Sequence, residues 1–161
     1  MPGSGKTAIG KKLANKLQYS FLDTDRLIET KLNATIDEIF RTQGELFFRQ
    51  AEQKLLKEYP FPMKSVIATG GGMPCEEENS ALLKSLGTVV YLKQSLQVLC
   101  QRLLHSPNKR PALQGKNEEE ILRYLVETLL KRQPFYEMAD IVVTGSKDGI
   151  TTLAQILQTD P

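Results

Sequence analysis

Close to its start, the chain carries a glycine-rich segment with the residue types of a phosphate-binding loop. Gly3-Ser4-Gly5-Lys6-Thr7 matches the second half of the motif G-x-x-x-x-G-K-[ST]. In such a loop, glycines let backbone N–H groups turn toward phosphate oxygens, the lysine brings charge to the β- and γ-phosphates, and the threonine offers a hydroxyl to Mg²⁺. A glycine-rich turn that caps a helix is the alternative, but it gives no reason for Lys-Thr. The segment therefore predicts a nucleotide-phosphate site made by Gly3, Ser4, Gly5, Lys6, Thr7 and Ala8.

The front of this motif departs from the pattern. The first glycine would fall just before Met1, and a strand that would lead into the loop is absent. Because such a loop is normally held between a central strand and a helix, one of its two supports is missing. We interpret this as a misassigned start or a shortened chain, and we expect poor folding and weak activity until the strand is restored.

Two aspartates follow the next apolar run. In Phe21-Leu22-Asp23-Thr24-Asp25 they lie two residues apart at the carboxyl end of a predicted strand, so both side chains are expected to project on the same side. Open α/β sheets bind ligands at that edge. One carboxylate could hold the water shell of Mg²⁺ while the other orients an attacking hydroxyl. A pair that caps the following helix fits these residues equally well.

Further candidate contacts come from a helix and from a glycine turn. Arg49 lies beside the apolar face of a predicted helix, where a guanidinium could fork onto a carboxylate, although spacing alone favours a solvated side chain. Gly70-Gly71-Gly72 follows a predicted strand and permits close approach of the backbone to a ligand. A plain turn would need only one such glycine, so three in a row favour a site.

Two more arginines could contact a ligand or could be ordinary surface charges. Arg110 lies in a stretch rich in proline and charge, 105–116, that we expect to be a mobile loop. It is either a cation that closes over phosphates or an exposed loop charge. Arg132 is predicted to end a helix, where a cation also favours the helix dipole.

Apolar periodicity predicts the elements that position these residues. Helices are expected at about 5–17, 26–41 in two pieces broken at Asn33, 44–57, 79–86, 95–104, 118–132 and 149–157, and strands at about 19–23, 64–69, 88–92 and 140–144. Because near-continuous apolar strands alternate with helices, the pattern indicates a parallel sheet covered on both faces. The predicted fold class is α/β with three layers.

Composition limits the class of protein. The 161 residues, of which 40% are hydrophobic and 25% charged, fit one globular domain. A net charge of +2 without a long basic run argues against a nucleic-acid partner. Cys75 and Cys100 lack the spacing of a zinc site or a disulfide framework, and no stretch is apolar enough to span a membrane. We therefore expect reduced thiols and a cytoplasmic protein without a membrane partner.

Taken together, GSGKT, FLDTD, GELFFR-x-x-E, GGG, KRP and KRQPFY occur in an order and spacing that resemble shikimate kinase over essentially the whole chain. The resemblance implies one domain over 1–161, with a sheet of order 2-3-1-4-5 that lacks its first strand here. It also implies a lid at about 105–117 and substrate-binding helices at about 24–58. The implied reaction is ATP- and Mg²⁺-dependent phosphorylation of the 3-hydroxyl of shikimate, in aromatic amino-acid biosynthesis, by a protein that we expect to be a monomer.

The resemblance also implies roles for individual residues. Asp25 would bind the attacking hydroxyl, and Asp23 with Thr7 would hold Mg²⁺ and its water shell. The carboxylate of shikimate would be gripped by Arg49 and Arg132. Backbone of Gly70, Gly71 and Gly72 would approach the ring. The phosphates would be met by Lys6 and Arg110 as catalytic cations, with Arg102 as a further neighbour, whereas residues 145–148 do not clearly reproduce the adenine-contacting pattern of the family.

Two other functions fit part of this pattern. Another P-loop small-molecule or nucleotide kinase would share the loop, but Arg49 with Arg132 favours a substrate that carries a carboxylate. A non-catalytic nucleotide-binding remnant would suit the incomplete loop, but the presence of Lys6, Asp25 and Arg110 argues against loss of activity.

Overall fold

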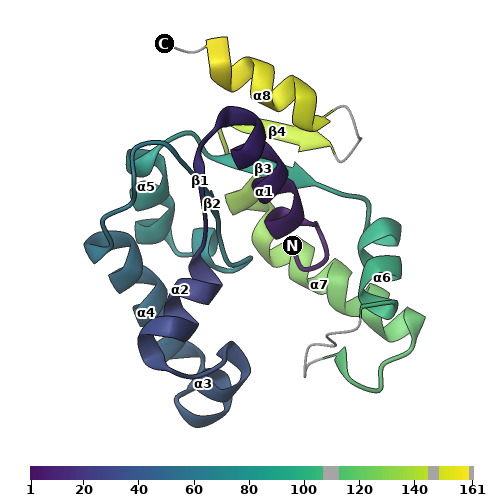
Figure 1. Cartoon of the computed structure of the whole chain (residues 1–161). Coiled ribbons are helices and arrows are strands. Elements are labelled where there is room, and N and C mark those ends of the chain that lie inside the picture. Colours follow the sequence, from purple (N-terminus) through teal and green to yellow (C-terminus); the bar gives the residue numbers. More distant parts are fainter. Residues whose placement is uncertain (107–112, 145–148, 160–161) are drawn as a thin grey trace. The chain divides into compact units, whose positions relative to one another are not determined.

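The computed structural model describes residues 1–106, 113–144 and 149–159 (Figure 1). These residues form two compact units. The β1–β2 unit contains 6–87 and 149–159, and the β3–β4 unit contains 1–5 and 88–144. The single domain expected over 1–161 stays a prediction.

The β1–β2 unit holds most of the helices. Its elements are α1 (Lys6–Leu17), β1 (Ser20–Asp23), α2 (Thr24–Leu32), α3 (Ile36–Thr42), α4 (Gly44–Glu58), β2 (Ser65–Ala68), the 3-10 turn η1 (Met73–Cys75), α5 (Glu77–Leu86) and α8 (Gly149–Thr159). β1 and β2 pair in parallel, from Ser20 opposite Ser65 to Asp23 opposite Ala68. Helix α1 packs on both strands, and a Cβ at Gly10 would lie 2.7 Å from the Phe21 ring, so a glycine permits this close approach.

Helices α2, α3 and α4 share a core of their own. Its buried members are Ile28, Ile39, Phe48 and Leu55. Asn33 ends α2 in the left-handed conformation with φ of 49°, which confirms the break predicted there. A capping box then starts α3, because the Thr35 side chain accepts from the Glu38 N–H and the Glu38 side chain accepts from the Thr35 N–H. This core holds α4 against α2, the helix that Asp23 caps and that contains Asp25.

The β3–β4 unit is built from β3 (Val90–Lys93), α6 (Leu96–Leu104), α7 (Glu118–Tyr136) and β4 (Ile141–Thr144). The strands pair in parallel, from Val90 opposite Ile141 to Lys93 opposite Thr144, and α6 packs on α7. Ser95 caps α6 through a hydrogen bond from the Val98 N–H. Strands in both units are therefore parallel and alternate with helices, which confirms the α/β class.

The end of α7 corrects one prediction. This helix runs to Tyr136 and contains Pro134, so Arg132 does not end it. A proline inside a helix removes one N–H donor and crowds the carbonyl four residues earlier, so contacts of the following residues must offset this cost. Here Tyr136 is buried, with its ring 5.1 Å from that of Tyr91. The helix-dipole explanation for Arg132 therefore loses its basis.

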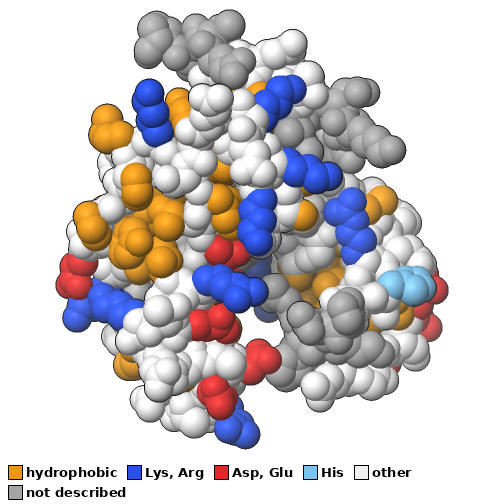
Figure 2. All heavy atoms as spheres, viewed as in Figure 1, with side chains coloured by type: hydrophobic (Ala, Val, Ile, Leu, Met, Phe, Trp, Pro, Cys, Tyr) orange, Lys and Arg blue, Asp and Glu red, His pale blue; other side chains and the backbone are white. Residues whose placement is uncertain are grey.

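In the expected order 2-3-1-4-5, β1 and β2 would be the neighbours 2 and 3, and β3 and β4 the neighbours 4 and 5. Both pairs are found, in separate two-stranded sheets of the described residues. A strand between these pairs stays a prediction. Figure 2 shows acidic and basic side chains interspersed on the face drawn. Among the residues that the structure describes, no helix has the length and apolar content to cross a membrane.

Candidate functional site

The start of α1 lies beside the end of β1. Thr7, the second residue of α1, donates its Oγ1 hydroxyl to Asp23 Oδ2 at 2.9 Å. The two residues predicted to serve Mg²⁺ are thus brought together. Both present oxygen, which is the ligand type that Mg²⁺ prefers. No cluster of three or more His, Cys, Asp or Glu side chains suited to a metal occurs in the described ranges.

Asp23 has two roles at once. Its Oδ1 accepts from the Asp25 N–H at 3.2 Å, which makes it the N-cap of α2, while Oδ2 accepts from Thr7. The capping bond and the bond from Thr7 therefore use different oxygens of one carboxylate, and the metal role of Asp23 stays a prediction. Asp25 lies in the first turn of α2 and not on the strand, so the expectation that strand alternation directs its side chain was wrong. The helix that begins at Thr24 sets its direction instead.

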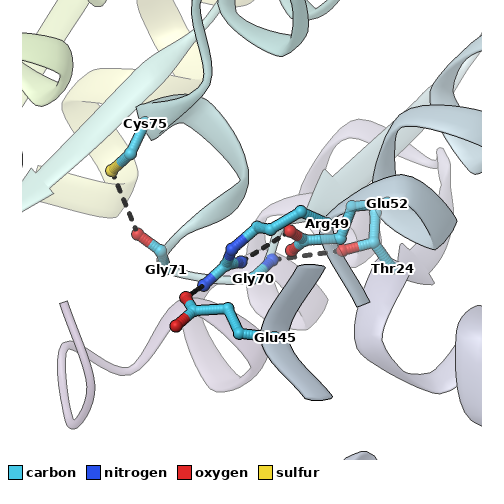
Figure 3. Close-up of polar contacts among 7 residues, drawn as sticks. All are labelled: Thr24, Glu45, Arg49, Glu52, Gly70, Gly71 and Cys75. Carbon is cyan, nitrogen blue, oxygen red and sulfur yellow. Dashed lines mark hydrogen bonds and ion pairs between the residues drawn. The ribbon is translucent and has the colours of Figure 1, made fainter. Parts of the chain in front are cut away.

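The glycine turn after β2 is where Asp25 meets α4. The Gly70 N–H donates to the Thr24 hydroxyl at 3.1 Å, and Thr24 is fully buried (Figure 3). A Cβ at Gly70 would lie 2.7 Å from Asp25 Oδ1 and 2.8 Å from Glu52 Oε1. Any larger residue would therefore push on both carboxylates. The neighbours that require a glycine here are side chains of the protein itself, and the predicted approach of this turn to a ligand stays a prediction.

Gly72 also has no room for a side chain, because of the neighbouring Arg49 guanidinium. A Cβ there would lie 2.6 Å from both Nη1 and Nη2 of Arg49. Gly71 lies between Gly70 and Gly72 in the chain, and its carbonyl accepts from the Cys75 thiol at 3.9 Å (Figure 3). Two of the three consecutive glycines are thus needed for space around the site, which a plain strand-to-helix turn would not require.

Arg49 is held by two carboxylates of its own helix. Nη1 donates to Glu52 Oε2 at 2.6 Å and Nη2 donates to Glu45 Oε1 at 2.8 Å. The exposed fractions of the side chains are 16% for Arg49, 0% for Glu52 and 66% for Glu45. Burial alone would lower the pKa of Arg49, but hydrogen bonds and charge from Glu52 and Glu45 more than offset it, so the pKa is raised above its usual value. The interpretation of Arg49 as a solvated surface residue was therefore wrong.

Two residues of this site were missed by the sequence analysis. Glu52 ends the segment GELFFR-x-x-E, and its i,i+3 spacing from Arg49 is the signal in the sequence for an ion pair. Thr24 gave no signal, because a threonine between two aspartates reads as an ordinary helix start. Only the position of Gly70 opposite the Thr24 hydroxyl gives this residue its function.

The front of the phosphate loop lies in the β3–β4 unit. Gly3 and Gly5 have φ of 74° and 88°, a left-handed conformation that glycine adopts without strain. Ser4 is buried, and its hydroxyl donates to the Met1 carbonyl at 3.0 Å. Arg102, in the last turn of α6, donates from Nη1 to the Gly3 carbonyl at 3.1 Å and to the Ser4 carbonyl at 3.2 Å.

The other predicted basic residues are less closely defined. Arg132 is partly exposed in the last part of α7, in a different unit from Arg49, so a joint grip on one carboxylate stays a prediction. Arg110, most of the predicted lid, and the predicted adenine turn at 145–148 lie outside the described residues.

Parallel strand pairs alternating with helices, a GSGKT segment that leads directly into α1, and acidic residues where β1 ends define a P-loop kinase. A family model described as shikimate kinase matches residues 2–160. The chain therefore belongs to the shikimate kinase family.

Individual relatives agree with this assignment. A shikimate kinase of Azobacteroides pseudotrichonymphae is 44% identical over 141 residues, which are 87% of this chain and 83% of the relative. The crystal structure of shikimate kinase from Bacteroides thetaiotaomicron matches with a TM-score of 0.87 and 37% identity, over 97% of this chain and 91% of that one. Shikimate kinase from Acinetobacter baumannii, solved in complex with shikimate, matches with a TM-score of 0.80 and 40% identity, over 98% and 87% of the two chains.

Proposed function

We propose that this chain transfers the γ-phosphoryl group of ATP to the 3-hydroxyl of shikimate, giving shikimate 3-phosphate and ADP. Membership of the shikimate kinase family supports this reaction. One observation in the structure carries the proposal: the glycine turn of the β1–β2 unit lies against both Asp25 and Arg49. Arg49 is itself held by Glu52. This arrangement offers a carboxylate for a hydroxyl and a cation for an anionic group.

The nucleotide end of the site follows from the loop. Backbone N–H groups of the loop and the start of α1 suit phosphate oxygens, and Lys6 adds positive charge where charge develops during transfer. Thr7 and Asp23 would hold Mg²⁺, through water in the case of Asp23, and the ion would neutralise phosphate charge. Catalysis here is mainly positioning and electrostatic stabilisation.

At the acceptor end, Asp25 would accept a hydrogen bond from the 3-hydroxyl and aim its oxygen at the γ-phosphorus. The new oxygen–phosphorus bond forms as the bond to ADP breaks, and the hydroxyl proton passes to Asp25. Arg49 would bind the carboxylate of shikimate. Because Glu45 is 66% exposed while Glu52 is buried, we propose that the substrate replaces Glu45 on Nη2 and that Glu52 keeps Nη1 in place.

A panel of acceptors tests the proposed reaction directly. ADP release is measured with shikimate, gluconate and a nucleoside monophosphate under the same conditions. We expect release with shikimate and no release above background with the other two, because Arg49 requires an anionic carboxylate and Asp25 a ring hydroxyl. Faster release with gluconate or with the nucleotide would assign the chain to another substrate, and no release with any acceptor would favour a non-catalytic nucleotide-binding protein.

Replacing Arg49 or Arg132 with alanine is expected to weaken shikimate binding by about ten- to a hundredfold, because a hydrogen bond to a charged group contributes about 1.5 to 3 kcal/mol. The affinity for ATP should stay nearly unchanged. Binding of each ligand is measured separately for each variant. Arg123→Ala is a matched control, since Arg123 is an exposed α7 residue that pairs only with Glu119 among the ion pairs of the described residues. Equal losses for shikimate and ATP would indicate a structural role.

A further inference from the structure

The contact between Arg102 and the phosphate loop indicates a role for this residue that the proposed reaction does not include. One nitrogen of this guanidinium, Nη1, donates to two consecutive carbonyls, those of Gly3 and Ser4. The same helix packs against the loop, because a Cβ at Gly3 would lie 3.3 Å from the Leu99 carbonyl and 3.4 Å from Leu103 Cγ. Helix α6 thus supports the front of the loop through packing and through hydrogen bonds.

Because a peptide unit is planar, hydrogen bonds that hold its carbonyl also fix the direction of its N–H group. In a trans peptide, the C=O and N–H of one unit point in opposite directions. The Gly3 carbonyl shares its plane with the Ser4 N–H, and the Ser4 carbonyl shares its plane with the Gly5 N–H. A cation that holds both carbonyls on one side therefore turns both N–H groups toward the other side. No cis peptide bond interrupts this relation in the described residues.

The charge of Arg102 adds a second effect. A carbonyl that accepts a hydrogen bond from a cation is polarised, and its N–H becomes a stronger donor, since linked hydrogen bonds reinforce one another. Two adjacent polarised amides that point the same way form the kind of concave donor pair that binds anions. Both effects act before any nucleotide arrives.

We propose that Arg102 is a positioning residue, which orients the Ser4 and Gly5 amides for nucleotide phosphate by holding the carbonyls behind them. This role differs from the direct phosphate contact implied by the family resemblance. The inference rests on the proposed function only for the identity of the nucleotide, because the geometry of the loop is present without a ligand.

The test compares Arg102→Met and Arg102→Lys with the unchanged protein, in the absence of nucleotide. The backbone order parameters of Ser4 and Gly5, measured by NMR relaxation, should fall in Arg102→Met, because the hydrogen bonds that fix both peptide units are lost. Affinity for ADP should fall by about tenfold, while the KM for shikimate stays unchanged. Arg102→Lys should recover part of both losses, since its ammonium can still donate to a carbonyl.

The control is Arg123→Met, which removes an exposed arginine of the same unit that pairs with Glu119 at 3.3 Å. It should leave the order parameters of the loop and the ADP affinity unchanged. Weaker ADP binding by Arg102→Met with unaltered order parameters of the free loop would overturn the proposal in favour of a direct contact with the nucleotide. Unaltered ADP binding would overturn it as well. The measurements on the free loop and of ADP affinity are made without shikimate. Their outcome therefore does not depend on whether the chain phosphorylates shikimate.

Discussion

Replacing Asp25 with asparagine is expected to lower the turnover of shikimate by about a hundredfold to ten-thousandfold, the range typical for loss of a general base. The amide keeps the shape of the side chain but cannot take up the hydroxyl proton. Asp25 lies against Gly70, with Oδ1 2.7 Å from the position of a Cβ there, and so faces the glycine turn predicted to approach the substrate. Because the replacement is isosteric, the melting temperature should change little.

Asp37→Asn is the matched control for this experiment. Asp37 is also the second residue of its helix, α3, so its replacement removes the same favourable interaction with a helix N-terminus. Its side chain is exposed. Turnover is measured by coupled ADP release, and folding by circular dichroism. A near-normal rate for Asp25→Asn would remove this residue from the mechanism.

Removal of Glu52 should have the largest effect on stability. Glu52 is fully buried and pairs with Arg49 at 2.6 Å. Glu52→Ala leaves the guanidinium, only 16% exposed, with Glu45 as its remaining ion-pair partner among the described residues. Breaking a buried pair in this way costs about 3 to 5 kcal/mol. This is a large part of the ~5 to 15 kcal/mol by which domains are stable. The melting temperature should fall by roughly 6 to 20 °C.

Two further variants separate the buried charge from other effects. Glu58→Ala removes an acid of the same helix whose side chain is 55% exposed, and should cost at most about 1 kcal/mol. The double variant Glu52→Leu with Arg49→Met removes both charges, so it should regain most of the stability while losing affinity for shikimate. Thermal melting and shikimate binding are measured for each protein. Equal destabilisation by the single and double variants would show that the ion pair is not the cause.

Much of the fold could be predicted from local patterns. The break at Asn33, the helix at the phosphate loop and the helix at about 95–104 all occur where the sequence indicated. Such features depend on residues close together in the chain, since capping groups and apolar periodicity act over one or two turns. The α/β class followed in the same way, from apolar strands that alternate with helices.

Two predictions made from local sequence patterns were wrong. Apolar periodicity indicated an end to α7 near Arg132, but burial of Tyr136 against Tyr91 holds one more turn. Alternation along β1 was expected to direct Asp25, but the helix begins one residue earlier. Packing outweighed the local preference at the end of α7, whereas at Asp25 the cap formed by Asp23 outweighed the alternation of the strand.

For the candidate site, the sequence by itself determined which residue types are available: a phosphate loop, paired aspartates, a glycine turn and several arginines. Only the tertiary structure decided their partners. Glu52 holds Arg49, the Thr24 hydroxyl receives the Gly70 N–H, and Arg102 binds the carbonyls of the loop and is 99 residues away from Gly3. Burial and pairing of this kind arise when distant segments are brought together, because an interior charge or polar group must find a partner wherever the fold places one.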